Sequence, residues 1–163
     1  MDSASPDGVG DQAKELAEAT ASFMYSQDST SQALGMSLVE VRPGYAHLKM
    51  TVREDMVNGH RLCHGGMIFA LADSAFAFAC NSYNVVTVAS GAQIEFLSPG
   101  NLGDELTAIA QERSRSRRNG IYDVTVSNQA GTSIALFRGR SRQFEGRFIL
   151  HGAHPPGAAS IRE

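Results

Sequence analysis

The sequence has little cysteine, little net charge and no hydrophobic run long enough to cross a membrane. Two cysteines in 163 residues, Cys63 and Cys80, are too few for a disulfide scaffold and indicate a reducing, cytoplasmic location. A net charge of -3 gives no general attraction to nucleic acid or to an anionic membrane. The longest apolar stretch, MIFALADSAFAFAC, is too short to span a bilayer and has an aspartate at its centre. We therefore expect neither nucleic acid nor membrane as a partner.

The two ends of the chain differ in composition from the middle. Residues 1–10 contain acidic residues, proline and glycine without an apolar run, so we expect a disordered leader rather than a signal peptide. Residues 145–163 are rich in glycine, alanine and proline and are expected to form a flexible tail. The remaining residues, 11–144, suit one domain with a core of its own. They contain no internal repeat, no GxGxxG and no P-loop.

The hydrophobic pattern predicts an α+β domain. Apolar side chains recur at helical spacing in residues 11–28, and residues 65–81 are apolar on nearly every side. One segregated helix among runs of strands favours an antiparallel sheet curled around that helix, with the last four strands as a meander. The uncovered side of the helix then needs a second subunit or another layer. The predicted strands are residues 36–42, 45–52, 85–97, 104–118, 121–128 and 132–144.

Asp73 is the most informative residue because it is a carboxylate in the middle of the apolar helix. Aspartate is a mediocre helix former, and an isolated buried carboxylate is costly. Perturbed carboxylates cluster at functional sites, but a buried aspartate bonded to a hydroxyl or an amide serves structure equally well. Ser74 is either a helper or a small packing residue. Asp73 is thus a candidate catalytic group.

A polar loop, NGHRLCHGG, precedes the apolar helix. Gly65 and Gly66 at a helix N-terminus let a substrate approach the backbone, whose free N–H groups stabilise an anionic oxygen. The same glycines also suit a tight turn into the helix. His60, Cys63 and His64 are spaced too closely for a usual structural zinc site, and no second pair follows, so we expect no metal.

Gly65 and Asp73 are eight residues apart, which corresponds to about 12 Å along a helix. One acyl carbonyl cannot be held by Gly65 and attacked with the help of Asp73 of the same chain. Two such helices that meet antiparallel in a two-fold dimer bring Gly65 of one chain toward Asp73 of the other. We therefore expect a homodimer with two equal, shared sites.

Two arginine-rich segments are candidates for binding phosphate. Arg113, Arg115 and Arg117 share one face if their segment is a strand, and guanidinium groups pair well with phosphates. A solvated edge strand protected by charge explains such a row equally well. A second row lies on the last strand: Arg138, Arg140 and Arg142.

Three segments resemble the PaaI-type phenylacetyl-CoA thioesterases of the hotdog superfamily: NGHRLCHGGMIFALADSAFAFACNS, VASGAQIEFLSPGNLGDELTAIAQE and GIYDVTVSNQAGTSIALFRGRS. The similarity covers about residues 20–144, and the motifs occur in the order of that family. It implies a hotdog fold and a dimer paired through its sheet, commonly a dimer of dimers. It also implies hydrolysis of an acyl-CoA thioester without a cofactor, since coenzyme A is part of the substrate.

The resemblance also implies roles for individual residues. Asp73 corresponds to the catalytic carboxylate, as nucleophile or general base, and Gly65 to the residue whose amide polarises the carbonyl. Asn58 and His64 correspond to positions that line the same pocket, and Ser90 to a strand position that assists the water or the carboxylate. The segment that meets the nucleotide end of coenzyme A corresponds to Arg115, Arg117, Arg118, Asn119 and Gly120.

The acyl group and two other functions remain open at this point. An aromatic or medium acyl chain is expected, and phenylacetyl or hydroxyphenylacetyl is implied by the resemblance alone. A hotdog hydratase or dehydratase usually pairs Asp with His in one loop, whereas Asp73 is on the helix. A non-catalytic acyl-CoA-binding module would tolerate loss of this carboxylate. The residues expected around the acyl chain are Met67, Phe69 and Phe76.

Overall fold

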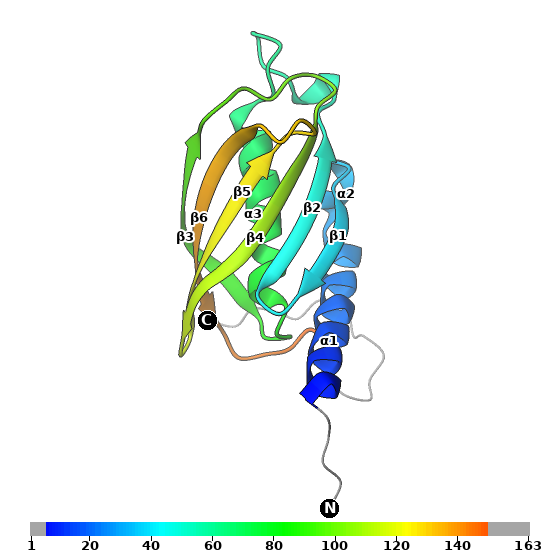
Figure 1. The fold of residues 1–163 in the computed structure, drawn as a ribbon, viewed down its shortest axis with the longest axis vertical. Helices are drawn as coiled ribbons and strands as arrows, with labels where there is room; N and C mark the ends of the chain where they lie inside the picture. Colours follow the sequence, from blue (N-terminus) through cyan, green and yellow to red (C-terminus); the bar gives the residue numbers. More distant parts are fainter. Residues whose placement is uncertain (1–5, 150–163) are drawn as a thin grey trace, which may run out of the picture.

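One antiparallel sheet curls around a central helix in the computed structural model, which describes residues 6–149 (Figure 1). The helices are α1 (Pro6–Gln27), α2 (Ser29–Ala33), the 3-10 helix η1 (Glu54–Met56) and α3 (Gly65–Asn81). The strands are β1 (Ser37–Arg42), β2 (Tyr45–Thr51), β3 (Thr87–Phe96), β4 (Glu105–Ser116), β5 (Asn119–Ser127) and β6 (Ser133–Gln143). Sheet and helix together form a hotdog fold, so the predicted fold class is confirmed. The sequence did not predict α2 or η1.

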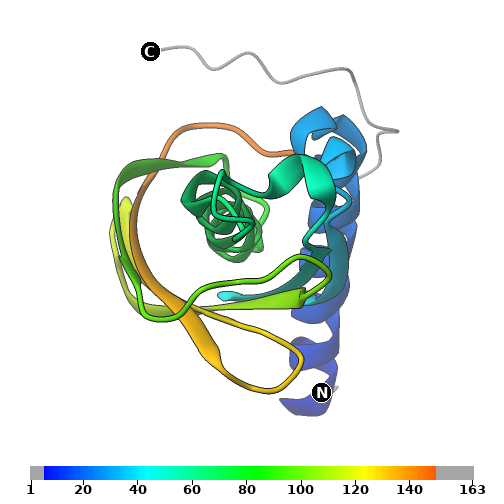
Figure 2. The ribbon, with the colours of Figure 1, turned by 90° about the horizontal axis from the view of Figure 1, so that it is seen from above.

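The strand order is β1-β2-β4-β5-β6-β3, with every pair antiparallel. The predicted four-strand meander is therefore wrong, because β3 pairs with β6 and not with β4. A short link places β3 directly after the end of α3, where it closes the curve of the sheet around the helix (Figure 2). The other edge of β3 has no partner strand within residues 6–149.

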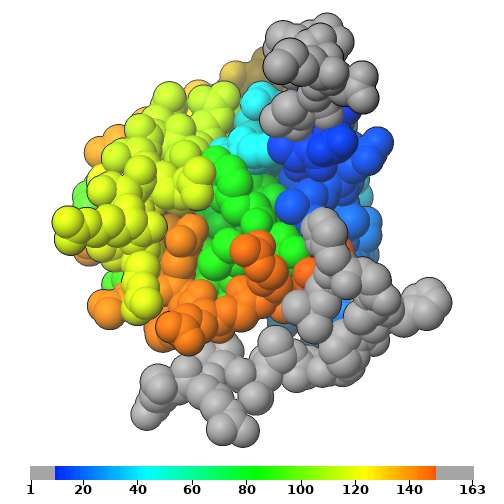
Figure 3. All heavy atoms as spheres, turned by 90° about the horizontal axis from the view of Figure 1, so that it is seen from below, coloured from blue at the N-terminus to red at the C-terminus, as the bar shows by residue number. Residues whose placement is uncertain are grey.

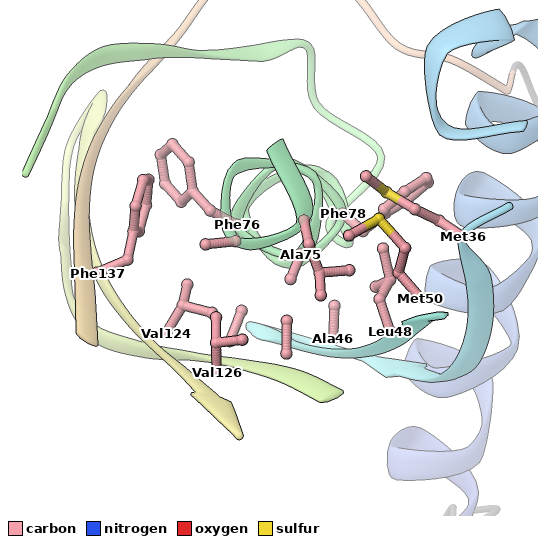
Figure 4. Close-up of a cluster of buried hydrophobic side chains, with 14 of the residues drawn as sticks. Met36, Ala46, Leu48, Met50, Ala75, Phe76, Phe78, Val124, Val126 and Phe137 are labelled. Atoms are coloured by element: carbon pink, nitrogen blue, oxygen red, sulfur yellow. The ribbon is translucent and has the colours of Figure 1, made fainter. Parts of the chain in front are cut away.

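The core fills the space between α3 and the concave face of the sheet (Figure 4). The ring of Phe76 on α3 packs against Tyr122 and Phe137, with centroid distances of 5.5 and 5.9 Å. Gly139 on β6 leaves room for this ring, since a Cβ at that position would lie 2.8 Å from Phe76. Strand β2 contributes its alternate residues, as its pattern predicts: Ala46, Leu48 and Met50.

The side of α3 that faces away from the sheet is only partly covered. Helix α2 touches it through Ser31, whose Oγ lies 3.2 Å from Oγ of Ser74. Four residues on this face are partly exposed and are called the uncovered stripe below: Ala70, Asp73, Ser74 and Ala77. No helix within the described part of the chain is long and apolar enough to cross a bilayer.

Both described ends differ from the prediction. Helix α1 begins at Pro6, so residues 6–10 are helical rather than a disordered leader; proline suits the first turn of a helix because its missing N–H is not needed there. Residues 145–149 are not a free tail, since Val86 accepts from Phe144 N (2.8 Å) and donates to the Gly146 carbonyl (3.1 Å). Residues 144–149 are called the strap below. Residues 1–5 and 150–163 lie outside the described part.

Candidate functional site

The N-terminus of α3 presents a backbone donor without a partner. His64 is the N-cap residue, and its Nδ1 accepts from the Gly66 N–H at 2.9 Å. The His64 carbonyl accepts from Met67 (2.8 Å) and Ile68 (3.3 Å). The Gly65 N–H donates to no acceptor within residues 6–149. It is therefore free to bind the oxygen of a ligand, and the positive end of the helix dipole favours negative charge there.

Gly65 and Asn58 lie on one pocket of about 330 Å³. The Oδ1 atom of Asn58 accepts from the His60 N–H (2.9 Å) and the Leu62 N–H (3.2 Å), which holds the loop in shape. Its Nδ2 has no acceptor in the described residues, so Asn58 is a second lining residue with an unused donor. Apolar residues complete the wall, among them Leu62, Ile68, Phe96 and Leu97.

His64 is not among the residues that line this pocket of the single chain. Its Nδ1 atom accepts the capping hydrogen bond from the Gly66 N–H, which is a structural task. No three His, Cys, Asp or Glu side chains between residues 6 and 149 lie close enough to hold a metal ion. Cys63 is buried, and burial raises the pKa of its thiol to about 11, so it stays protonated at neutral pH.

Asp73 lies on the uncovered stripe of α3, and its side chain is partly buried. Partial burial removes the Asp73 carboxyl from water and thereby raises its pKa above the ordinary value. No hydrogen bond to this carboxylate occurs within the described residues, and the neighbouring Ser74 hydroxyl contacts Ser31 instead. The structural alternative required a hydroxyl or amide partner for Asp73. No hydroxyl or amide of residues 6–149 fills that role.

Asp73 is separate from the Gly65 pocket of its own chain. It lies eight residues after Gly65 on the same continuous helix, which is about 12 Å along the axis. Asp73 is also absent from the residues that line that pocket. One chain alone therefore does not bring the free N–H group and the carboxylate together.

Ser90 also lies outside the Gly65 pocket. It is exposed on β3, at an irregularity in the pairing between Ala89 and Gly91. Its hydroxyl donates to the carbonyl of Arg140 on the neighbouring strand at 3.1 Å. The structure thus gives Ser90 a bond within the sheet and no contact with Asn58 or Gly65.

The predicted row of three arginines on β4 is not a single face. A bulge between Glu112 and Ser114 breaks the alternation. Arg113 donates to Asp123 at 3.0 Å, whereas the Arg115 guanidinium stacks on the Tyr83 ring, 3.8 Å from its centroid. Arg115 also pairs with Glu112 at 3.5 Å. Arg115 is consequently held by its own chain.

The tip of the β4–β5 hairpin carries the remaining residues of this segment and projects from the body of the molecule (Figure 3). Arg117 has a positive φ of 52° in the turn, so it is not a strand residue. Arg118 pairs with Glu145 at 3.8 Å, and both side chains are largely exposed. Asn119 and Gly120 begin β5. The second row of arginines is exposed on β6 and comprises Arg138, Arg140 and Arg142. Arg138 donates to Asp123 of the neighbouring strand.

Comparison with known proteins agrees with this architecture. The model of the thioesterase superfamily matches residues 60–135. Acyl-coenzyme A thioesterase PaaI of Escherichia coli (strain K12) is 47% identical over 123 residues, which cover 76% of this chain and 88% of that protein.

Solved structures give the same result. The E. coli PaaI protein from the phenylacetic acid degradation operon has a TM-score of 0.82 and 44% identity, and the match covers 83% of this chain and 98% of that one. A mutant of the phenylacetic acid degradation protein PaaI from Thermus thermophilus has a TM-score of 0.69 and 36% identity, and the match covers 72% of this chain and 100% of that one. The chain is therefore a thioester hydrolase and belongs to the PaaI type of the hotdog thioesterase superfamily.

Proposed function

We propose that this chain hydrolyses the thioester of an aromatic or medium acyl-CoA at a site shared between two subunits. In this proposal the Gly65 N–H of one subunit binds the carbonyl oxygen, and Asp73 of the other is the nucleophile or general base. The observation that carries the proposal is that α3 presents both an unused N–H group and an unpaired, half-buried carboxylate. These two groups supply what thioester hydrolysis needs.

The free edge of β3 supports the shared site. If this edge pairs with its own copy about a two-fold axis at mid-strand, Phe96 of one chain lies opposite Thr87 of the other. Phe96 is beside Gly65, since a Cβ on Gly65 would lie 3.1 Å from its ring. Thr87 is tied to the end of α3, because its N–H donates to Asn81 Oδ1 at 2.8 Å. Such pairing carries Gly65 of one chain toward the second half of α3 in the other.

The chemistry then needs few groups. With Asp73 as general base, water attacks the acyl carbonyl carbon and the carbon–sulfur bond breaks. With Asp73 as nucleophile, its carboxylate attacks that carbon, the carbon–sulfur bond breaks to give a mixed anhydride, and water then cleaves the anhydride at the Asp73 carbonyl. In both routes the products are the carboxylic acid and the thiol of coenzyme A. A thiolate is a good leaving group, so no strong general acid is required. The free amide of Asn58 is a second donor at the same pocket. No cofactor enters the reaction.

The nucleotide end of coenzyme A is assigned to the tip of the β4–β5 hairpin. Arg117 forms no ion pair within residues 6–149, and the exposed pair of Arg118 with Glu145 is weak enough to exchange for a phosphate. Arg115 is held on Tyr83 and supports the hairpin beside Asn119 and Gly120.

The proposals on substrate, assembly and location rest on the relatives and on the state of the cysteines. Phenylacetyl-CoA or hydroxyphenylacetyl-CoA is the proposed substrate, because the E. coli relative comes from the phenylacetic acid degradation operon. A homodimer, assembled further into a dimer of dimers, is the proposed assembly. The two free, buried thiols of Cys63 and Cys80 suit a reducing compartment, which supports a cytoplasmic location.

Substitution of Asp73 tests the function. The Asp73→Ala protein should bind acyl-CoA esters but release no thiol, and the wild-type chain should hydrolyse them. Full hydrolysis by the variant would refute the catalytic assignment. A single turnover in heavy-oxygen water then separates the two roles of Asp73, since only a nucleophile acquires the label.

A further inference from the structure

Strand β3 forms one edge of the sheet (Figure 1), and its outer face has opposite charge at its two ends. This outer face is the one that β3 shares with the exposed, alternate residues of β6. Near the start of β3, Val88 lies opposite Arg142 on this face. Gly91 follows opposite Arg140, and Glu95 lies on the same face, directly before the last residue of the strand. The edge is therefore basic beside the start of β3 and acidic beside its end.

The two arginines and the glutamate beside this edge have no ion-pair partner among residues 6–149. Arg138, on the same strand as the two arginines, pairs with Asp123 at 2.6 Å. Arg140 and Arg142 pair with no carboxylate in that region, and Glu95 pairs with no cation there. Water satisfies exposed charges of this kind, so their contribution depends on what is brought beside the edge.

The guanidinium group of Arg140 already extends over β3. A Cβ on Gly91 would lie 2.8 Å from Nη2 and 3.2 Å from Nε of Arg140. The side chain therefore crosses from β6 to the edge strand, and the missing side chain of Gly91 leaves room for it. Neighbouring strands are about 4.8 Å apart. The charge of Arg140 thus lies about one strand spacing closer to a strand added at the free edge than its backbone does.

The bulge in β3 agrees with the two-fold pairing of this edge. Residues directly opposite each other in an antiparallel pair point to the same face of the sheet. If Phe96 lies opposite Thr87 of the partner subunit, Glu95 lies opposite Val88 of the partner subunit. Glu95 follows Val88 by seven residues, so strict alternation would place them on opposite faces. The extra residue at the bulge, Ser90, brings both to the outer face.

Two-fold pairing then places each acidic end beside the basic end of the other chain. Glu95 of one subunit lies across β3 from Arg142 of the partner subunit, with about two strand spacings, or 10 Å, between their backbones. It lies diagonally from the guanidinium group that covers Gly91. A copy added in parallel would instead bring like charges together. The edge is thus complementary to an antiparallel copy of itself.

Resting on the proposed function, which supplies the pairing of β3, we infer that Glu95 of one subunit forms ion pairs with Arg140 and Arg142 of the partner subunit. These charges select a second, antiparallel copy of this chain as the strand added to β3. Each exposed ion pair contributes little to affinity. Like charges at the same places disfavour a wrong partner, so the main effect is on the choice of partner.

Charge reversal tests this inference through that choice. One variant has Glu95→Lys, and the other, called the arginine variant, has Arg140→Glu together with Arg142→Glu. Each variant paired with itself has like charges at both ends of the interface, whereas a mixed dimer has opposite charges at both ends. Native mass spectrometry of the co-expressed chains measures the fraction of mixed dimer. Random association gives about one half, and we expect about nine-tenths at low salt.

Glu40→Lys is the matched control. Glu40 is an exposed glutamate on β1, at the opposite edge of the sheet. Its reversal changes the net charge as Glu95→Lys does but leaves the β3 edge intact. A mixed dimer with the arginine variant then has one favourable and one unfavourable end, which is the average of the two homodimers. This pair should therefore form about one half of mixed dimers.

The outcomes separate the inference from the proposed function. If the wild-type chain dimerises and hydrolyses acyl-CoA but the Glu95→Lys and arginine variants mix at random, the ion pairs are overturned and the proposed function stands. An equal excess of mixed dimers with Glu40→Lys also overturns them, since net charge then explains the result. A monomeric wild-type chain overturns the pairing of β3 and the shared site together. Circular dichroism identifies a variant that fails to fold, and Arg142→Glu alone then replaces the arginine variant.

Discussion

Phe96 lies directly beside Gly65, since a Cβ added to Gly65 would lie 3.1 Å from the Phe96 ring. This proximity places the N-terminus of α3, with its unused N–H group, next to the end of the edge strand β3. Phe96 and Leu97 beside it are each more than half exposed, at 54% and 53%. The amide proposed to bind the carbonyl therefore borders an apolar surface next to the free strand edge.

Two substitutions of Gly65 separate its N–H group from its small size. Proline suits the first position of a helix, and His64 before it has the extended backbone that precedes proline, with φ -61° and ψ 133°. Gly65→Pro removes the N–H, whereas Gly65→Ala retains it and adds a methyl group. We expect the proline variant to have a kcat about 100-fold below that of the alanine variant. Equal kcat values in steady-state assays, with equal melting temperatures, would exclude the amide from catalysis.

The pH dependence of activity follows from the raised pKa of Asp73. The reaction needs the ionised carboxylate, so kcat/KM should fall as pH decreases through this raised pKa. Stability should change in the opposite direction. A carboxyl that is harder to ionise in the folded state binds extra protons there, so stability falls as pH rises from the ordinary to the raised pKa.

The Asp73→Asn variant is the control for this pH effect. It should lack the stability change, and at neutral pH it should melt above the wild-type protein. Melting curves across the acidic range compare the two proteins. A wild-type melting temperature that rises relative to the variant across that window would contradict the assigned cause, which is desolvation.

Glu112 should matter for stability because it is the acceptor for two tyrosines. Its carboxylate accepts from the hydroxyls of Tyr122 (2.7 Å) and Tyr83 (3.0 Å). Tyr122 is 1% exposed, so Glu112→Ala leaves its hydroxyl buried without this partner. We expect a loss of about 1–3 kcal/mol in the free energy of unfolding, measured with urea. Glu105→Ala is the control, since it breaks an exposed pair with Lys49 that is worth about 0–1 kcal/mol.

Gly139 should tolerate no side chain beneath Phe76. A Cβ there would lie 2.8–2.9 Å from several ring atoms. Gly139→Ala should therefore destabilise the fold by about 1–3 kcal/mol through overpacking. The double variant with Phe76→Leu should recover part of this loss in the same urea titration. If the two substitutions lower the free energy of unfolding additively, the clash with the Phe76 ring is not the cause of the loss.

Local patterns were sufficient to predict most elements but not their arrangement. The helix at 65–81 follows from its continuous apolar run. The predicted hairpin forms, but its turn is at Arg117 and Arg118, and Asn119 and Gly120 already belong to β5. The placement of β3 beside β6 depends on non-local pairing, which no local pattern encodes. The cap of α3 by His64 was missed because a nearby Cys/His cluster suggested other uses.

The largest omission from the sequence-based prediction was the strap. Its glycine- and proline-rich context suggested mobility, yet Asn84, distant in sequence, supplies the hydrogen bonds that hold it. An asparagine directly before a predicted strand was the one available signal, because asparagine favours left-handed turns. Likewise, the bulge that separates Arg113 from Arg115 has no local signature in the sequence.

Complementation between two inactive variants tests the shared site most directly. Asp73→Asn and Gly65→Pro chains, each nearly inactive alone, are unfolded, mixed in equal amounts and refolded together. A mixed dimer then has one intact site, built from the wild-type Gly65 of one chain and the wild-type Asp73 of the other. With random pairing, about a quarter of the wild-type activity should return. If refolded mixed dimers form but activity stays at the level of the separate variants, both groups act within one chain and the shared-site account is wrong.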